Sequence, residues 1–127
     1  AYGATTVSAT MLIAAMAGIP IFVTGGIGGV HRGAEKSWDV SRDLRELGEV
    51  GVTVVCSGAK AILDIPKTLE YLETEGVTVL SNRAKTFANF YSVSSSDPVD
   101  AVFDTPEEAA SIIKAKMDLG LSGGILI

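Results

Sequence analysis

Strand-like and helix-like stretches alternate along this chain, and the alternation limits the folds that are open to it. The strand-like apolar runs lie at residues 19–23, 52–56, 77–80 and 123–127. The helical patterns lie at residues 5–17, 41–49, 66–75 and 106–119. Strands that alternate with helices usually pair in parallel, and the helices then cover both faces of the sheet. We therefore expect an α/β fold, a three-layer α/β/α sandwich with a mostly parallel sheet.

The N-terminal helical stretch, residues 5–17, is apolar on nearly every side. That pattern predicts a helix that its neighbours bury on all faces. Gly18 and Pro20, directly after it, end this helix. We expect the first strand-like run, residues 19–23, to be a buried strand. The polar, aromatic and serine-rich stretch at residues 82–98 instead predicts an irregular excursion with at most one short strand.

The length and composition of the chain exclude several kinds of partner. Its 127 residues suit one domain, so we expect a single α/β domain over residues 1–127. A formal net charge of −5 offers no basic surface to nucleic acid. The longest apolar run, residues 11–23, is interrupted and too short for a membrane span, and no charged leader precedes it. We expect no nucleic acid, no membrane and a cytoplasmic location, which the lone Cys56 in an apolar run also fits.

Four glycines lie among residues 24–29 (TGGIGG), directly after the first apolar run. Glycines let backbone amides approach an anion closely, as phosphate-binding loops do. The stretch matches neither the dinucleotide fingerprint nor the P-loop, so a plain flexible turn fits these residues at least as well as a phosphate cradle. His31 follows this loop, where it could contact a polar ligand or be an ordinary surface histidine.

Asp39 and Asp43 are four residues apart, so a helix that begins near Asp39 would carry both on one face. Carboxylates of this kind suit a hard cation such as Mg²⁺ or Mn²⁺, which keeps several of its waters. The alternative is that Asp39 caps the helix and Asp43 complements its dipole. Spacing alone favours this alternative.

Lys60 follows the apolar run at residues 52–56 almost immediately, in the segment SGAK. Partial burial there would favour the neutral amine, which is the nucleophile of Schiff-base chemistry. Most loop lysines are solvated surface charges, and on position alone this is the favoured interpretation of Lys60. The small residues Gly58 and Ala59 beside it leave room for a ligand.

Three uninterrupted stretches of the sequence resemble one known family. They are TTVSATMLIAAMAGIPIFVTGGIGGVHRGAE, WDVSRDL and VTVVCSGAKAILDIPKTLEYLETEGV. On these motifs the chain is similar to the pseudouridine-5'-phosphate glycosidase family, also called the indigoidine synthase A family. The resemblance implies a homotrimeric α/β/α enzyme that binds Mn²⁺ and reversibly splits pseudouridine 5'-phosphate into uracil and ribose 5-phosphate. The bond that is cleaved joins two carbons.

The resemblance also implies roles for individual residues. Lys60 matches the catalytic lysine that forms an imine with C1 of ring-opened ribose 5-phosphate, and Asp39 matches the Mn²⁺ position. The substrate-binding positions that it implies are Val7, Thr24, Gly25, Gly26, His31, Ser41, Arg42 and Asp43. Uracil is a poor carbon leaving group, so an imine suits this bond better than oxocarbenium chemistry with two carboxylates.

Both ends of the chain look truncated, because it begins without a methionine and ends on the apolar residues 125–127 in mid-strand. The resemblance agrees, since it implies a catalytic glutamate and a second lysine before Ala1 and further sequence after residue 127. We therefore expect these residues alone to have little or no glycosidase activity. Two alternatives stay open: a noncatalytic phosphosugar or nucleotide-binding module in which Lys60 contacts a phosphate, and a structural piece without a ligand.

Overall fold

The structure, a computed structural model, describes residues 2–88 and 97–127 of the chain. Its helices are α1 (Val7–Met16), α2 (Ala34–Ser37), α3 (Arg42–Glu49), α4 (Ile65–Thr74) and α5 (Pro106–Asp118). Its strands are β1 (Ile21–Val23), β2 (Thr53–Val55), β3 (Thr78–Asn82), β4 (Ala101–Phe103) and β5 (Ile125–Leu126). Helices and strands alternate along most of the chain, as the sequence predicts.

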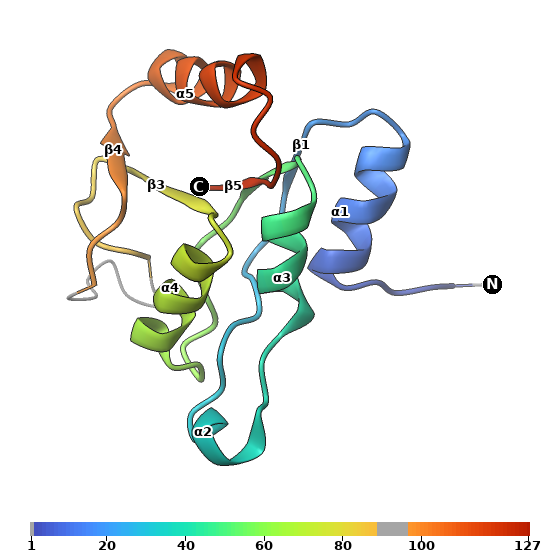
Figure 1. Ribbon diagram of the computed structural model, residues 1–127, viewed down its shortest axis with the longest axis vertical. Coiled ribbons are helices and arrows are strands. Elements are labelled where there is room, and N and C mark those ends of the chain that lie inside the picture. Colours follow the sequence, from blue (N-terminus) through green and yellow to red (C-terminus); the bar gives the residue numbers. More distant parts are fainter. Residues whose placement is uncertain (1, 89–96) are drawn as a thin grey trace.

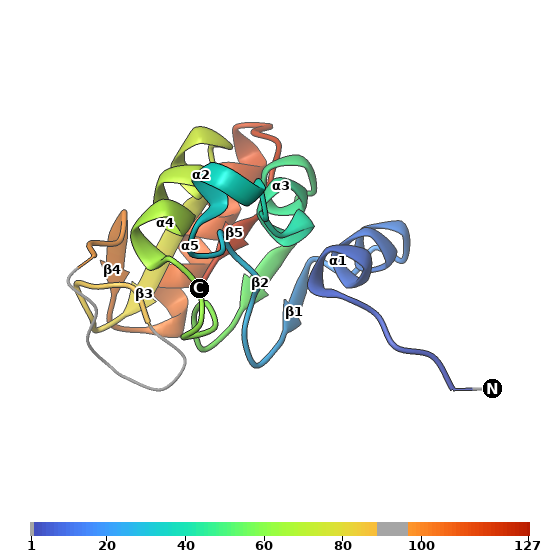
Figure 2. The same cartoon turned by 90° about the horizontal axis from the view of Figure 1, so that it is seen from below.

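The strands form one sheet in the order β1-β2-β5-β3-β4, which Figure 2 shows from β1 at the right to β4 at the left. Each pair of neighbouring strands is parallel, and the last strand of the chain lies at the centre, where Ile125 is in register with both Thr53 and Thr78. The predicted parallel sheet is thus confirmed. Because the strands are parallel, their carboxyl ends all meet at one edge of the sheet.

The two faces of the sheet build two separate hydrophobic cores. Successive side chains of a strand point to opposite faces. Accordingly, Ile125 packs in a small core with Leu80, Phe103 and Ala109, the last of which belongs to α5. Its neighbour Leu126 packs in the larger core, which contains Met11 of α1, Leu44 and Leu47 of α3 and Leu72 of α4. Figure 1 shows the strands between α5 and the pair α3 and α4, which confirms the three-layer α/β/α arrangement.

The two middle helices form where their sequence signals predict. Ser41 caps α3, and its Oγ accepts the N–H of Asp43 at 3.2 Å. Asp64 caps α4 in the same way, through the N–H of Lys67 at 3.2 Å. Such caps satisfy amides that have no partner within the helix. The predicted spans differ from the observed ones by one residue at most, apart from the capping residues.

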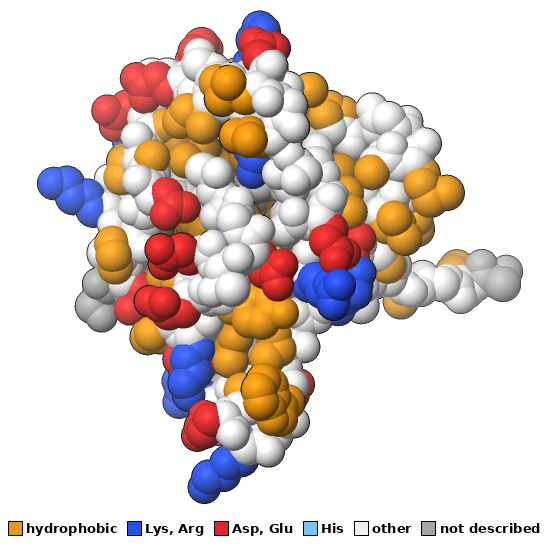
Figure 3. Space-filling view, in the orientation of Figure 1, with side chains coloured by type: hydrophobic (Ala, Val, Ile, Leu, Met, Phe, Trp, Pro, Cys, Tyr) orange, Lys and Arg blue, Asp and Glu red, His pale blue; other side chains and the backbone are white. Residues whose placement is uncertain are grey.

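The N-terminal elements are less buried than the sequence predicts. Only Ser8, Met11 and Ala14 of α1 are buried, whereas Met16 is 81% exposed. The strand β1 lies at one edge of the sheet, and its residue Val23 is 75% exposed. A helix that is apolar all round buries only the face that meets a neighbour, which here is the face against α3. Figure 3 shows the remaining apolar side chains of this region at the right of the molecular surface.

The sequence patterns did not predict two short elements, α2 and β4, and they predicted one long connection only as irregular. The single-turn helix α2 lies between Gly33 and Trp38, both of which have a positive φ angle, and β4 contains only three residues. The predicted irregular excursion at residues 82–98 falls in part on residues 89–96, which lie outside the described residues. At its ends, Thr86 and Pro98 form an isolated antiparallel bridge.

None of the helices within the described ranges is long and apolar enough to cross a membrane.

Candidate active site

A cavity of about 460 Å³ lies where the chain leaves β1 and β2 at their carboxyl ends. Seven of the ten predicted site residues line it: Val7, Thr24, Gly26, His31, Ser41, Asp43 and Lys60. The lining residues that sequence reasoning missed are Thr5, Thr6, Gly28, Ile62 and Leu63. Each of these lies within three positions of a predicted residue, so the available signal was their proximity in sequence. The cavity occupies the sheet edge where ligands bind in parallel α/β folds.

The glycine loop, residues 24–29, runs alongside the segment that leads to Lys60. The N–H of Thr24 donates to the carbonyl of Val55 at 2.9 Å, and the N–H of Ser57 donates to the carbonyl of Gly25 at 2.9 Å. The N–H of Ile27 then donates to the carbonyl of Gly58 at 3.1 Å. These bonds continue the parallel ladder of β1 and β2 beyond the strands, so the two segments enter the cavity side by side.

Lys60 is anchored through its backbone while its side chain stays exposed. Ala59 is fully buried and bridges to Ile27, and the carbonyl of Lys60 accepts the N–H of Leu63 at 3.0 Å. The partial burial considered for the Lys60 side chain is not observed, because Lys60 is exposed at the lining of the cavity. The hydrogen bonds therefore fix the position of the Lys60 backbone, and the exposed side chain can reach a ligand in the cavity.

The carboxylate of Asp43 joins three parts of the cavity wall. One oxygen accepts the N–H of Ser8 at 2.9 Å, and the other accepts the N–H of Gly28 at 2.8 Å. Asp43 is only 7% exposed. A carboxylate at the N-terminus of α1 also complements the helix dipole. Asp43 thus ties α1, the glycine loop and α3 together across the cavity.

Asp39 lies outside helix α3, so the predicted shared helix face with Asp43 is wrong. Its carbonyl accepts the N–H of His31 at 3.0 Å, and its carboxylate lies 3.8 Å from Nδ1 of His31. The Asp39 side chain is 62% exposed. The alternative, that Asp39 caps the helix, is also wrong because Ser41 is the capping residue. His31 and Asp39 form a solvent-exposed pair at the edge of the cavity.

Two of the four loop glycines, Gly28 and Gly29, are required by close packing, which neither a flexible turn nor a phosphate cradle predicts. A Cβ on Gly28 would lie 2.6 Å from Cβ of Ser41, and a Cβ on Gly29 would lie 2.6 Å from Oγ1 of Thr68. Several loop amides are already used in internal hydrogen bonds. Gly26 lines the cavity, and within the described part of the chain its N–H has no partner, so it could still donate to a ligand.

Arg42 and Gly25 do not line the cavity. The Arg42 guanidinium lies along α3, where Nε donates to Glu46 at 3.0 Å and Nη2 donates to Glu49 at 3.1 Å. The contribution that the structure shows for Arg42 is therefore to pair with the buried carboxylate of Glu46. Gly25 takes part through its carbonyl in the backbone ladder.

The residues around Asp39 fit a hydrated cation better than a closed metal cage. Among the described residues, no three His, Cys, Asp or Glu side chains come together in a way that could hold a metal ion. Both oxygens of Asp43 already accept buried N–H groups, so Asp43 does not complete such a set. The exposed carboxylate of Asp39 could hold Mn²⁺ as a single protein ligand, with water in the other positions.

The single cysteine is not a second nucleophile for this cavity. Burial raises the pKa of the Cys56 thiol, although its sulfur accepts the N–H of Gly58 at 3.3 Å. A raised pKa keeps the thiol protonated at neutral pH, and the thiolate is the reactive form. The Cys56 thiol is therefore expected to be unreactive.

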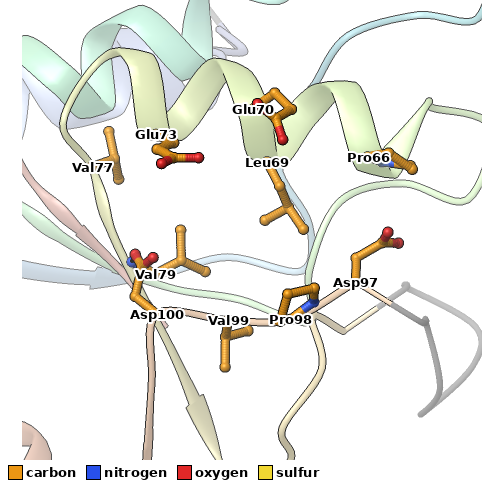
Figure 4. Close-up of a pocket in the computed structure, with 10 residues that line it drawn as sticks. All are labelled: Pro66, Leu69, Glu70, Glu73, Val77, Val79, Asp97, Pro98, Val99 and Asp100. Atoms are coloured by element: carbon orange, nitrogen blue, oxygen red, sulfur yellow. Dashed lines mark hydrogen bonds between the residues drawn. The ribbon is translucent and has the colours of Figure 1, made fainter.

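A second cavity of about 230 Å³ lies between α4 and the segment that precedes β4 (Figure 4). Glu70 and Glu73 of α4 stand at its rim, and Asp100 accepts the N–H of Val79 at 2.7 Å. Its lining also includes the apolar residues Leu69 and Val99, which lie on opposite sides of the cavity. No predicted site residue lines this cavity.

Fold and site together define a parallel α/β protein with a lysine-bearing cavity at the carboxyl ends of its strands. The family model described as indigoidine synthase A like protein matches residues 1–127, and the chain belongs to this family. The resemblance seen in the sequence motifs is thereby confirmed.

Proteins named pseudouridine-5'-phosphate glycosidase are close relatives of this chain. It is 52% identical to that of Hahella chejuensis over 125 residues and 61% identical to that of Caldanaerobacter subterraneus subsp. tengcongensis over 124 residues. In both cases 98% of this chain is covered. The chain spans only 41% and 40% of the length of these two relatives.

Two solved structures have the same fold. The prealnumycin C-glycosynthase AlnA, in complex with ribulose 5-phosphate, matches 98% of this chain with a TM-score of 0.93 and 44% identity. An indigoidine synthase A-like protein from Thermotoga maritima matches 96% with a TM-score of 0.89 and 37% identity. The chain covers 41% and 40% of these two structures.

Proposed function

We propose that this chain supplies the nucleophile of a pseudouridine-5'-phosphate glycosidase, which reversibly cleaves the C–C glycosidic bond to give uracil and ribose 5-phosphate. The observation that carries the proposal is the cavity in which Lys60 lies with six other predicted substrate-binding residues. Relatives at 52% to 61% identity bear this enzyme name. A related C-glycosynthase binds ribulose 5-phosphate, a pentose phosphate of the same chemical class as the proposed product.

In the proposed cleavage, Lys60 acts as the covalent catalyst. After the sugar ring opens, the neutral amine of Lys60 forms a bond with C1 of the sugar. The bond between C1 and C5 of uracil then breaks, C5 takes up a proton, and C1 becomes the carbon of an imine with Lys60. Water hydrolyses the imine to ribose 5-phosphate and frees the lysine, so one water is consumed per turnover. The resemblance assigns the proton to a glutamate that precedes Ala1 in the family pattern.

The other lining residues would position the open-chain sugar. Thr24, Ser41 and the N–H of Gly26 offer hydrogen-bonding groups at the cavity surface, and His31 adds a ring nitrogen. Holding C1 close to the amine turns imine formation into an effectively unimolecular step, which is a large part of such catalysis. Arg42 and Gly25 would contribute indirectly through the framework of the site.

We propose further that the protein binds Mn²⁺ through Asp39, assembles as a homotrimer and acts in the cytoplasm. The exposed Asp39 carboxylate beside the cavity supports the first of these, and the family resemblance supports all three. Bound Mn²⁺ would supply a positive charge for sugar or phosphate oxygens.

The test uses a protein of the relatives' full length that contains residues 1–127, which we call the full-length carrier. Pseudouridine 5'-phosphate should yield uracil and ribose 5-phosphate in equal amounts. Lys60→Arg keeps the positive charge but cannot form the imine, so its product formation should fall to background. Equal turnover by the parent and by Lys60→Arg would refute the proposal.

A noncatalytic phosphosugar-binding module is the second candidate. The exposed Lys60 and the unpaired N–H of Gly26 suit contacts to a phosphate as well as to a reacting sugar. This candidate predicts saturable binding of ribose 5-phosphate to the full-length carrier by calorimetry, with no product from pseudouridine 5'-phosphate.

A further inference from the structure

Thr68 of α4 is fully buried, and its hydroxyl makes two hydrogen bonds. Oγ1 donates to the carbonyl of Asp64 at 2.7 Å, one turn earlier in the chain, and accepts the N–H of Val30 at 3.0 Å. Val30 follows the glycine loop directly and is itself buried. Thr68 does not line the cavity. Its side chain therefore acts on the loop from behind.

Through Val30, this hydroxyl joins the two segments that carry cavity residues. The carbonyl of Val30 accepts the N–H of Asp64 at 2.9 Å, so both polar groups of Val30 are held from the side of α4. The next residue, His31, bridges to Leu63, and Leu63 donates its N–H to the carbonyl of Lys60. The segment that carries His31 and the turn that carries Lys60 thus share one set of hydrogen bonds, which includes those of the Thr68 hydroxyl.

The contact leaves no room for adjustment. A Cβ on Gly29 would lie 2.6 Å from Oγ1 of Thr68 and 3.0 Å from Cδ1 of Leu63. The loop backbone therefore lies directly against this side chain. If the hydroxyl were removed, the buried N–H of Val30 would lose its partner, and the loop would have to move to find another.

We propose that Thr68 is a positioning residue for the reaction at Lys60. It fixes the glycine loop and His31 relative to the turn that carries Lys60, and so sets where the sugar lies relative to the amine. The inference rests on the proposed function, because it assumes that bond formation at Lys60 is the step that needs this geometry. Such steps are sensitive to displacements of about 1 Å.

The decisive variant is Thr68→Val in the full-length carrier, because valine has nearly the shape of threonine but lacks the hydroxyl. We expect kcat for pseudouridine 5'-phosphate cleavage to fall by about ten- to a hundredfold while KM changes by less than about threefold. Thr68→Ser, which restores the hydroxyl, should keep kcat within about threefold of the parent.

Two control variants separate positioning from stability. Thr74→Val removes the same kind of bond, from Oγ1 of Thr74 to the carbonyl of Glu70 at 2.9 Å, at an exposed site on the same helix. Leu72→Val weakens the core beneath that helix and leaves both hydrogen bonds of the Thr68 hydroxyl in place. Both controls should keep the parent kcat at a temperature where they are folded.

Parent-like kcat in folded Thr68→Val would overturn the inference, and so would an equal loss of kcat in Leu72→Val. If Thr68→Val does not fold, Thr68→Cys takes its place, because a thiol is a weak acceptor of similar size. A kcat for Thr68→Cys equal to that of Thr68→Ser would then overturn the inference. Absence of turnover in the parent itself would refute the proposed function instead.

Discussion

Two regions in and around the cavity differ in how their side chains are used. The buried frame consists of Asp43 and Thr68, whose side-chain oxygens accept N–H groups of Ser8, Gly28 and Val30. The reactive edge consists of Lys60, His31 and Asp39, whose side chains reach solvent. Both regions border the same glycine loop. The polar side-chain atoms of the frame make hydrogen bonds within the protein, and those of the edge are available to a ligand.

This difference shows how a short loop can be both rigid and chemically open. A buried N–H that loses its partner is costly, so the frame tolerates little displacement. Exposed charged groups make weak internal contacts and can exchange them for a ligand. The carboxylates of Asp39 and Asp43, only four residues apart, therefore do different work. Substitutions in the frame should change stability, and at Thr68 also the reaction rate through the position of the loop, whereas substitutions at the edge should change the chemistry with little effect on stability.

The largest stability effect is expected for Asp43→Ala. This variant leaves the N–H groups of Ser8 and Gly28 without a partner, and we expect a loss of about 2–4 kcal/mol in the free energy of unfolding. Asp39→Ala is the matched control at the edge, and its change should stay within about 0.5 kcal/mol. Urea unfolding of the full-length carrier measures both. Similar losses for the two variants would contradict the division into frame and edge.

Gly29→Ala should have the next largest effect. The new Cβ would press on Thr68 and Leu63, and overpacking of this kind costs about 1–3 kcal/mol. Gly3→Ala is the control, since nothing lies within 4 Å of a Cβ at that position. Both are compared by thermal unfolding. A Gly29→Ala variant as stable as Gly3→Ala would mean that the loop is not held against α4.

Asp64 caps α4, and its carbonyl accepts the hydroxyl of Thr68, so it adjoins the frame and should show a smaller, pH-dependent effect. The N–H of Lys67, and then its ammonium group, hold the pKa of the Asp64 carboxyl below its usual range. A lowered folded pKa means that the stabilisation is present above the unfolded pKa of about 3.9 and is lost as the pH falls through the folded value. Asp64→Asn keeps a capping side chain but removes the charge.

The parent should therefore exceed Asp64→Asn in stability by less than about 1 kcal/mol at pH 6, and the difference should shrink towards pH 3. Urea midpoints at the two pH values measure it. A difference that grows on acidification would contradict the assigned direction of the pKa shift.

The smallest stability effect is expected for Lys60→Met. The side chain is exposed, so the free energy of unfolding should change by no more than about 0.5 kcal/mol. Calorimetric unfolding of the full-length carrier checks this. A loss of several times that size would place Lys60 in the frame rather than at the reactive edge.

Local sequence signals predicted those parts of the fold that depend on local physics. The helical patterns at residues 41–49 and 66–75 place α3 and α4 correctly, although the cap of α3 is Ser41 and not Asp39. The apolar runs locate four of the five strands that the structure describes. Burial of α1 and β1 was not predictable in the same way, because it depends on which neighbours are present.

The candidate site, like the fold, was predictable from the sequence only in part. The sequence motifs identified most of the residues that line the cavity, because the glycine loop and the Lys60 segment follow neighbouring parallel strands. The bond from Ser8 to Asp43 joins residues 35 positions apart, and no periodicity signals it. Thr68 looks like an ordinary helix residue in sequence. Its role depends on the approach of the glycine loop, which only the folded structure reveals.

Borohydride trapping tests the central claim, that Lys60 is the amine which bonds to the sugar. The full-length carrier is incubated with ribose 5-phosphate, reduced, digested and mapped by mass spectrometry. We expect a reduced pentose phosphate adduct on Lys60 and its disappearance in Lys60→Arg. An adduct confined to any other residue, or no adduct in a carrier that turns over pseudouridine 5'-phosphate, would contradict the claim.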